Sequence, residues 1–440
     1  MQAPAQPEQH DRDPRVTGRH DTPTQTKANR LVGRHIRHAA DFGVNAGEPT
    51  IDWSVTMTRK QKVIDQLTNG LSSLLKNRKV TVYPGTGRLN GDHTVTVSGD
   101  DGSVATLAGD HVILAAGSVP RSIPGFDVDG RLITTSDEVL SIDRLPASAI
   151  VIGGGAIGCE FASMMADLGT EVTILEAMPK ILPGCDKDVA DVVVRSFKKR
   201  GITIRTGVPV TGHNPDPSGT TTTVSFGEGE SLQVELVVVS VGRRPFPDLL
   251  GLDGTGIATD QRGFVQVDEL CRTSAEGVYA IGDLIATPQL AHVAFAEGMV
   301  VIKDILGESP LPIDYERIPW AIYCHPEVAF AGHSEASAKE AGYDVVAAKH
   351  RYIGNGRAVI LGETDGLVKV IAERAPDGRA GRVLGVHMVG PWVTEQLGQG
   401  YLAVNWEATV DEVAAFIQPH PSMSELFGET VLSLTGRSLH

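Results

Sequence analysis

The chain has 440 residues, of which 41% are hydrophobic and 21% charged, and its formal net charge is −15. This composition is typical of a soluble globular protein with roughly three domains, and the negative charge disfavours nucleic acid and anionic membranes as partners. No apolar run is long enough to span a bilayer, and the N-terminus does not have the apolar core segment of a secretory signal peptide. The four cysteines are scattered and suggest neither a disulfide framework nor a metal site. We therefore expect a cytoplasmic protein.

The character of the sequence changes near residue 26. Residues 1–26 are rich in Pro, Gln, Asp, Arg and His and contain almost nothing to bury. Such a segment cannot offset the entropy lost on ordering, so we expect it to be disordered. From Lys27 onward, "LVGRHIRHAADFGV" and "VIDQLTNGLSSLLKNR" show apolar residues at helical spacing, and "KVTVYPGTGRL" predicts a strand followed by a glycine turn.

An internal repeat follows these elements. "DHVILAAGSVP" (Asp110–Pro120) aligns with "ELVVVSVGRRP" (Glu235–Pro245), since both read acid, apolar strand, glycine and proline. Each is preceded by an alternating hairpin with a glycine turn, "TVTVSGDDGS" in one case and "TTTVSFGEGES" in the other. This similarity predicts two copies of one α/β unit.

The second copy begins with a dinucleotide-binding pattern. "AIVIGGGAIGCEFASMMADLGTEVTILE" reads strand, Gly153-x-Gly155-x-x-Gly158, helix, strand and acid. Gly153 allows a tight turn, Gly155 lets the backbone approach a pyrophosphate, and Gly158 lets the helix pack closely on the strand. Glu176 follows the glycine pattern at the sequence separation expected of the acid that binds a ribose 2′-hydroxyl. An acid at this position repels a 2′-phosphate, so NAD is favoured over NADP. The alternative is a βαβ turn with a purely structural role.

The first copy lacks such a beginning. No Gly-x-Gly-x-x-Gly occurs before Asp110. We therefore expect the first half of that unit to be absent from this chain.

Several separate segments resemble one family. "ILAAGSVPR", "GVYAIGDLI" and "QLAHVAFAEG" resemble the FAD-binding segments of the flavoprotein disulfide reductases (class I pyridine nucleotide-disulfide oxidoreductases), and within them of the dihydrolipoamide dehydrogenases. The resemblance implies FAD-binding residues Lys27, Gly87, Ala116, Gly117, Ser118, Asp283, Gln289, Leu290, Ala291 and His292. It implies NAD-binding residues Gly153, Gly154, Gly155, Ala156, Ile157, Gly158, Glu160, Glu176, Val210 and Gly242.

The C-terminal region carries the remaining part of the resemblance. "YCHPEVAFAG" resembles the start of the family's dimerisation domain, and "HPSMSE" resembles a segment whose histidine reaches the flavin site of the partner subunit. The resemblance implies a homodimer in which His420 is the base that accepts a thiol proton and Glu425 orients its ring. The alternative for this pair is a histidine and a carboxylate that cap a helix start.

The thiol pair that would donate this proton is not in the sequence. In the family, two cysteines spaced C-x4-C shortly precede a stretch like "TKA"; here the corresponding positions are Gly18 and Pro23, and no other cysteines have that spacing. Three accounts follow: a truncated or wrongly started dihydrolipoamide dehydrogenase, a cysteine-free NADH-dependent flavoprotein with diaphorase activity, or a non-catalytic, dimeric NAD-binding module. The His420–Glu425 pair favours the first, because without a dithiol neither residue has a catalytic role.

We therefore predict an α/β chain with two doubly wound, Rossmann-like nucleotide-binding domains and an α+β dimerisation domain. The expected domains are an incomplete FAD domain at 27–144 and 273–314, an NAD domain at 145–272 and the dimerisation domain at 315–440. The resemblance implies NAD-linked oxidation of a dihydrolipoyl group, free or carried by a 2-oxoacid dehydrogenase complex, through FAD and a dithiol. Without the missing segment, we expect the chain to be poorly soluble, to hold little flavin and not to turn over lipoamide.

Overall fold

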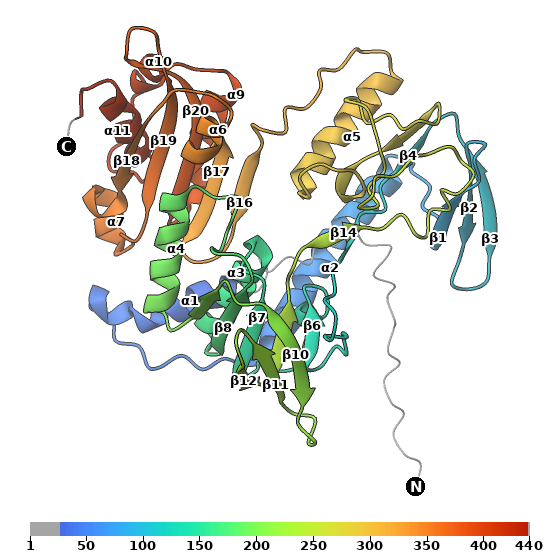
Figure 1. The fold of residues 1–440 in the computed structure, drawn as a ribbon, viewed down its shortest axis with the longest axis horizontal. Coiled ribbons are helices and arrows are strands. Elements are labelled where there is room, and N and C mark those ends of the chain that lie inside the picture. The colour runs from blue at the N-terminus through green and yellow to red at the C-terminus, as the bar shows by residue number, and fades with distance from the viewer. Residues whose placement is uncertain (1–26, 439–440) are drawn as a thin grey trace.

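The computed structural model describes residues 27–438, so the segment 1–26 that was predicted to be disordered lies outside the described residues. Figure 1 shows three units: blue strands at one side, a central green sheet, and an orange-to-red C-terminal unit. Among the helices between residues 27 and 438, none combines the length and the apolar character needed to cross a bilayer.

The first unit contains two small sheets. Three strands form an antiparallel meander, and two others pair in parallel next to a helix that begins at Ala291. Leu89, Leu114 and Val278 pack together in the core of this unit. Its elements are β1 (Thr86–Leu89), β2 (Thr94–Ser98), β3 (Val104–Ala108), β4 (Val112–Leu114), β5 (Ser118–Pro120), β15 (Val278–Ala280), η4 (Gly282–Leu284) and α5 (Ala291–Ile305).

The second unit is a five-stranded parallel sheet in the order β6-β13-β7-β8-β9. Successive side chains of its central strand, β7, point to opposite faces of the sheet. Val151 packs with the helices on one face, and Ile150 packs with a second antiparallel meander on the other. Both faces are therefore buried, as expected for a parallel sheet. Its elements are β6 (Ile133–Thr135), η3 (Glu138–Ser141), β7 (Ser148–Ile152), α3 (Ala156–Leu168), β8 (Glu171–Glu176), α4 (Lys187–Lys199), β9 (Thr203–Thr206), β10 (Val210–Pro215), β11 (Thr222–Phe226), β12 (Glu230–Val234), β13 (Leu236–Val239) and β14 (Arg243–Pro245).

The repeat predicted from the sequence is present in the structure. The meander β1–β3 leads into β4 and β5, and the meander β10–β12 leads into β13 and β14. The ends of the two copies meet, because β5 and β14 pair antiparallel with Arg243 opposite Pro120. This two-stranded contact joins the two nucleotide units.

Two segments pack in a different unit from the one that the predicted domain boundaries at residues 144 and 272 assign to them. β6, which was predicted to belong to the first unit, pairs with β13 in the second sheet. Conversely, Ile257, Val265 and Cys271 pack in the core of the first unit. Hydrophobic periodicity identifies the individual strands but not the sheet that each strand joins, which explains both differences.

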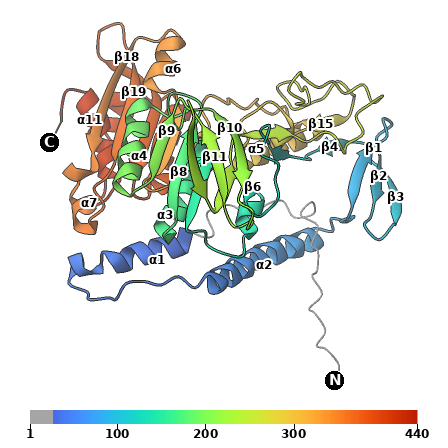
Figure 2. The same ribbon diagram turned by 60° about the horizontal axis from the view of Figure 1, so that its bottom comes forward.

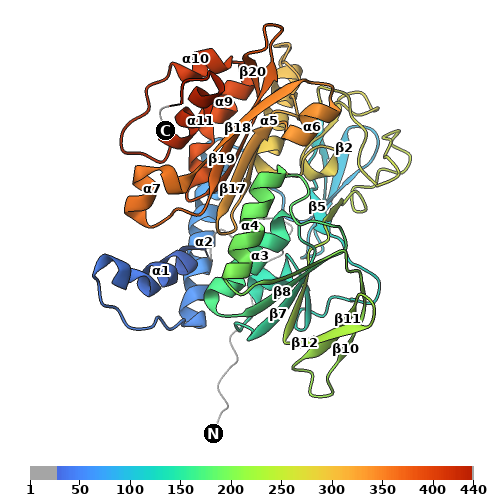
Figure 3. The same cartoon turned by 60° about the vertical axis from the view of Figure 1, so that its left-hand side comes forward.

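The third unit is an antiparallel sheet in the order β16-β17-β20-β19-β18. Val386 and Met388 pack under the C-terminal helices on one face, whereas Phe330, Leu367 and Val389 pack against the core of the second unit. The sheet therefore lies between its own helices and the second unit (Figure 3). Its elements are β16 (Pro319–Ile322), β17 (Glu327–Gly332), α6 (Glu335–Glu340), β18 (Val345–Arg351), η5 (Tyr352–Gly354), α7 (Gly356–Leu361), β19 (Leu367–Arg374), β20 (Ala380–Gly390), α8 (Val393–Gln396), α9 (Gly398–Asn405), α10 (Val410–Ala414) and α11 (Glu425–Leu434).

Two N-terminal helices run beneath the second unit (Figure 2). They are α1 (Lys27–Arg37), followed by η2 (Ala39–Phe42), and α2 (Trp53–Asn77). The Asp52 side chain caps α2 by accepting from the Val55 amide at 3.1 Å. The Trp53 indole donates to the Ile142 carbonyl at 3.1 Å, which fixes this helix on the second unit.

Candidate active site

The glycine-rich turn between β7 and α3 has the backbone geometry that its sequence predicts. Gly153 has φ +108°, and a β-carbon there would collide with the Ser240 carbonyl. A β-carbon on Gly158 would collide with the Gly153 carbonyl, so helix and strand pack too closely for any other residue. Gly155, in contrast, faces open space, which leaves room for a phosphate at the helix N-terminus beside Ala156 and Ile157.

Glu176 lies at this turn. Its Oε2 accepts from the Gly154 amide at 2.6 Å, and its Oε1 accepts from the Met178 amide at 2.7 Å. The carboxylate is thus held at the end of β8 beside the glycine turn. This arrangement fits NAD, because the acid is positioned to accept from a ribose hydroxyl.

Three further residues of the predicted NAD set have different surroundings. Gly242 lies next to β14 with φ +104° and open space where a side chain would be. The Glu160 carboxylate accepts from the Tyr323 amide at 2.7 Å and so contacts the C-terminal unit. The Val210 side chain packs against the core on the meander side of the sheet. Contact of these residues with NAD stays a prediction.

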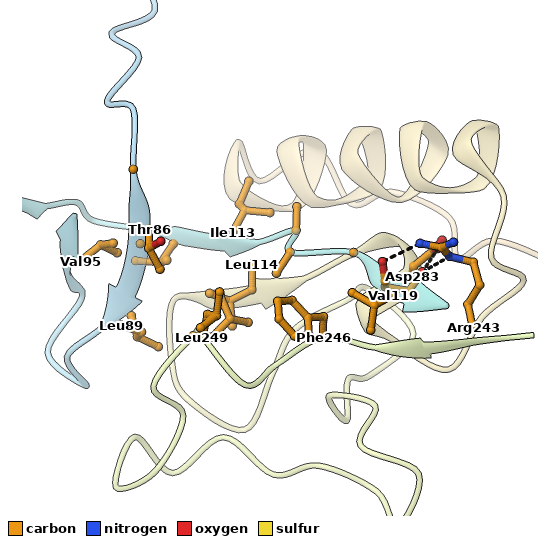
Figure 4. Close-up of a pocket in the computed structure, with 18 residues that line it drawn as sticks. Thr86, Leu89, Val95, Ile113, Leu114, Val119, Arg243, Phe246, Leu249 and Asp283 are labelled. Atoms are coloured by element: carbon orange, nitrogen blue, oxygen red, sulfur yellow. Dashed lines mark hydrogen bonds and ion pairs between the residues drawn. The ribbon is translucent and has the colours of Figure 1, made fainter. Parts of the chain in front are cut away.

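A cavity of about 620 Å³ lies in the first unit (Figure 4). Gly87, Ala116, Gly117 and Ser118 line it, and so does Asp283. These residues come from β1, from the segment after β4 and from η4, so the fold brings Gly87 together with two of the segments that resemble FAD-binding segments.

The start of α5 contributes a polar atom without a partner. The Gln289 Nε2 is buried and has no hydrogen-bond partner among residues 27–438. A buried amide without a partner is costly, and a bound FAD at this helix start would supply the acceptor. Leu290 and Ala291 form the helix N-terminus, and His292 Nε2 donates to the Pro319 carbonyl at 2.8 Å. α1 begins at Lys27, whose contact with FAD stays a prediction.

Arg243 is a residue of this cavity that the sequence reasoning missed. Its Nε donates to the Ser118 hydroxyl at 2.7 Å, and that hydroxyl donates to Asp283 Oδ2 at 2.5 Å. The same guanidinium donates to the Ser118 carbonyl and lies 3.5 Å from Asp137 Oδ1. The available signal was the repeat, since Arg243 and Ser118 follow equivalent glycines.

His420 and Glu425 meet as predicted. Their Nδ1 and Oε1 atoms lie 2.8 Å apart, and the other carboxylate oxygen accepts from the Ser422 amide at 2.7 Å. Because a carboxylate can only accept, the neutral ring carries its proton on Nδ1 and leaves the Nε2 lone pair available. The His420 side chain is 79% exposed, so this lone pair is accessible from outside the subunit.

All four cysteines are buried, and none of them forms a disulfide. Burial raises the pKa of the Cys185 and Cys271 thiols to about 12 and also raises that of Cys159. Cys159, Cys185 and Cys324 share one core, although they are far apart in sequence. Such thiols are poor nucleophiles, and no group of residues within 27–438 could hold a metal ion.

Comparison with known proteins places this geometry in a family. Residues 17–298 match the pyridine nucleotide-disulphide oxidoreductases, and residues 318–431 match the dimerisation domain of the same enzymes. The chain belongs to the pyridine nucleotide-disulphide oxidoreductase family. Members of this family are oxidoreductases that use FAD and NAD, and the dimerisation domain supports a homodimer.

Individual relatives agree with this assignment. A dihydrolipoyl dehydrogenase of Bacillus subtilis is 38% identical over 423 residues, covering 93% of this chain and 88% of the relative. One from Cupriavidus necator is 36% identical, covering 92% and 84%. The crystal structure of LpdA from Mycobacterium tuberculosis has a TM-score of 0.87 at 26% identity, covering 94% of this chain and 89% of that one. The predicted resemblance and fold class are therefore confirmed.

Proposed function

We propose that this chain has the site of an oxidoreductase of the dihydrolipoyl dehydrogenase type, which oxidises a dihydrolipoyl dithiol with NAD once a C-x4-C thiol pair is supplied. The observation that carries the proposal is the 2.8 Å contact between His420 Nδ1 and Glu425 Oε1 in a chain that also has an NAD-type glycine turn ending at Glu176. Relatives named dihydrolipoyl dehydrogenase, 36% and 38% identical, support the choice of reaction.

The two nucleotide units have separate tasks. In the second unit, Gly155 and the N-terminus of α3 bind the pyrophosphate of NAD, and Glu176 binds its adenosine ribose. In the first unit, Asp283 would accept a hydrogen bond from bound FAD, and the segment Ala116–Ser118 would help to hold the cofactor in the same cavity. Bound FAD supplies the hydride chemistry, and the protein supplies position and electrostatics.

His420 acts on the substrate. Its Nε2 accepts the proton of the substrate thiol that attacks the enzyme disulfide, and Glu425 stabilises the imidazolium that results. Because Glu425 is also held by the Ser422 amide, the carboxylate keeps one orientation through both protonation states. The base therefore needs no rearrangement between proton uptake and release.

The position of His420 suits a site shared between subunits. The segment that precedes it exposes Phe416 at 62% and Ile417 at 97%, and Trp406 on the same unit is 76% exposed. Apolar side chains this exposed are typical of a surface that a partner covers. We infer that a second copy covers them and that His420 then faces the flavin cleft of that copy. The substrate is a dihydrolipoyl group, free or carried by a 2-oxoacid dehydrogenase complex.

The experiment must supply the thiol pair that the sequence lacks. We define the extended thiol-pair protein as this chain with Gly18→Cys and Pro23→Cys, preceded by a strand–helix segment with a Gly-x-Gly-x-x-Gly turn. With FAD, it should reduce NAD when given dihydrolipoamide, and NADP should serve far less well. A dye acceptor with NADH provides the control. Dye reduction without any dihydrolipoamide oxidation, in a protein that holds FAD, would refute the proposed substrate and leave a diaphorase.

A further inference from the structure

A second cavity lies away from both nucleotide sites, between α4 and the C-terminal sheet. It measures about 290 Å³, and it is bordered by Arg195 and Lys199 of α4 and by Arg351 at the end of β18. Figures 1 and 3 both show α4 beside this sheet. The cavity therefore spans the contact between the second and third units.

One end of this contact has balanced charges. Lys349 Nζ lies 2.6 Å from Asp188 Oδ1, and Lys369 Nζ lies 2.9 Å from Asp188 Oδ2 and 3.0 Å from Asp186 Oδ2. Asp186 and Lys369 are almost fully buried. Here acids at the start of α4 pair with lysines of the sheet, so the buried charges compensate each other.

The other end has cations on both sides. Arg195 and Lys199 lie about two and three turns beyond Asp188 along α4, and Arg351 is two residues beyond Lys349 on the same face of β18. Only Lys199 has a carboxylate partner, Asp365, at 3.7 Å. Neither guanidinium has an ion pair or hydrogen bond with any residue between 27 and 438. Like charges that border one cavity repel each other, and an anion between them would remove the repulsion.

We propose that this cavity binds a small phosphate-bearing anion that bridges α4 and the C-terminal sheet. Guanidinium groups match phosphate oxygens in pairs, and Ser196 and Thr364 line the same cavity with hydroxyl groups. The volume is close to the lower limit of about 300 Å³ for small-molecule sites, so the ligand is of metabolite size. Because the ligand contacts both units, its binding stabilises their contact.

The test is a titration of the 440-residue chain with inorganic phosphate at constant ionic strength, followed by calorimetry. Saturating NADH is present throughout, so that the glycine turn of the second unit cannot bind the phosphate. We expect saturable binding that Arg195→Gln and Arg351→Gln each weaken about tenfold or more, the scale of a lost charge-assisted hydrogen bond. Lys198→Gln removes the same charge from a neighbouring position of α4 that does not border the cavity, and it should leave binding unchanged.

NADH affinity provides the folding control, since none of these residues lies in the glycine turn or beside Glu176. Unsaturable binding, or equal weakening by Lys198→Gln, would mean general attraction of anions and would overturn the proposal. Binding that survives both arginine substitutions in variants of normal NADH affinity would place the phosphate elsewhere and overturn it as well. Failure of either kind leaves the proposed reaction untouched, because dihydrolipoamide oxidation does not involve this cavity.

Discussion

Arg243 Nε donates to the Ser118 hydroxyl at 2.7 Å, and these two residues occupy equivalent positions in the two copies of the internal repeat. Each follows the glycine at the end of its apolar strand, at Gly117 in one copy and Gly242 in the other. The ends of the two equivalent strands are therefore in contact. The Ser118 hydroxyl, which accepts from Arg243, in turn donates a hydrogen bond to Asp283. One guanidinium thus connects the acid expected to bind FAD with the strand end beside the NAD unit.

Replacement of this guanidinium should destabilise the protein. The Arg243 side chain is only 18% exposed and contacts Ser118, Asp137 and Asp283. Arg243→Gln leaves part of this network unsatisfied, so we expect a loss of about 2–4 kcal/mol in the free energy of unfolding. Arg244→Gln is the matched control on the same strand, because Arg244 is 47% exposed and pairs with Asp248 at the surface. Thermal unfolding should show a clear drop for the first variant only; equal drops would contradict a special role of Arg243.

Glu176 should set the preference for NADH. Glu176→Ala removes the carboxylate that holds the Gly154 amide at 2.6 Å, and Glu176→Arg also adds a charge that suits a 2′-phosphate. We expect NADH affinity to fall about tenfold or more for either variant, with a relative gain for NADPH in the arginine variant. Fluorescence titration measures both affinities. Unchanged NADH binding would remove Glu176 from the ribose site.

Stability should fall as the solution becomes mildly acidic, through His387. This ring is 1% exposed, its Nε2 donates to the His333 carbonyl at 2.9 Å, and its Nδ1 has no partner within 27–438. Burial lowers the pKa of His387 to about 4, below its ordinary value of 6.5. Between these two pH values, His387 binds a proton in the unfolded chain but not in the folded chain. The contribution of neutral His387 to the free energy of unfolding is therefore complete above pH 6.5 and is lost as the pH falls towards 4.

Denaturant unfolding between pH 5 and pH 7 measures this effect. The contribution of His387 to the slope reaches at most about 1.4 kcal/mol for each unit of pH. The slope should become shallower in His387→Gln, whose side chain does not titrate but retains a donor. An unchanged slope in that variant would assign the acid sensitivity to other groups.

The 440-residue chain itself should not turn over lipoamide. It has no C-x4-C pair, and its four thiols are buried. A thiol buried like Cys185 or Cys271, whose pKa is raised to about 12, is not ionised at neutral pH and reacts slowly with a disulfide. NADH consumption with lipoamide and added FAD should stay at background. Sustained lipoamide reduction by the 440-residue chain would contradict this prediction, because it would require a reactive thiol pair among the four buried cysteines.

The features predicted correctly from the sequence depend on neighbouring residues. The turn from Gly153 to Gly158 and the contact of His420 with Glu425 are both determined within a few residues of chain, so spacing indicates the first and a short segment of family resemblance implies the second. The clustering of Cys159 with Cys324, the position of β6 in the second sheet and the Arg243 contacts depend instead on segments far apart in sequence. Pattern and periodicity contain no information on such contacts, apart from the repeat that relates Ser118 to Arg243.

We expect His420, oriented by Glu425, to accept the thiol proton during NAD-linked oxidation of a dihydrolipoyl group. The most direct measurement is the rate of dihydrolipoamide oxidation by the extended thiol-pair protein and by its His420→Gln and Glu425→Gln variants. We expect His420→Gln to lower the rate about 100-fold or more, with Glu425→Gln between it and the parent, while NADH affinity stays unchanged in all three. A His420→Gln variant that oxidises dihydrolipoamide within about twofold of the parent rate would contradict the account, since a general base contributes far more than that.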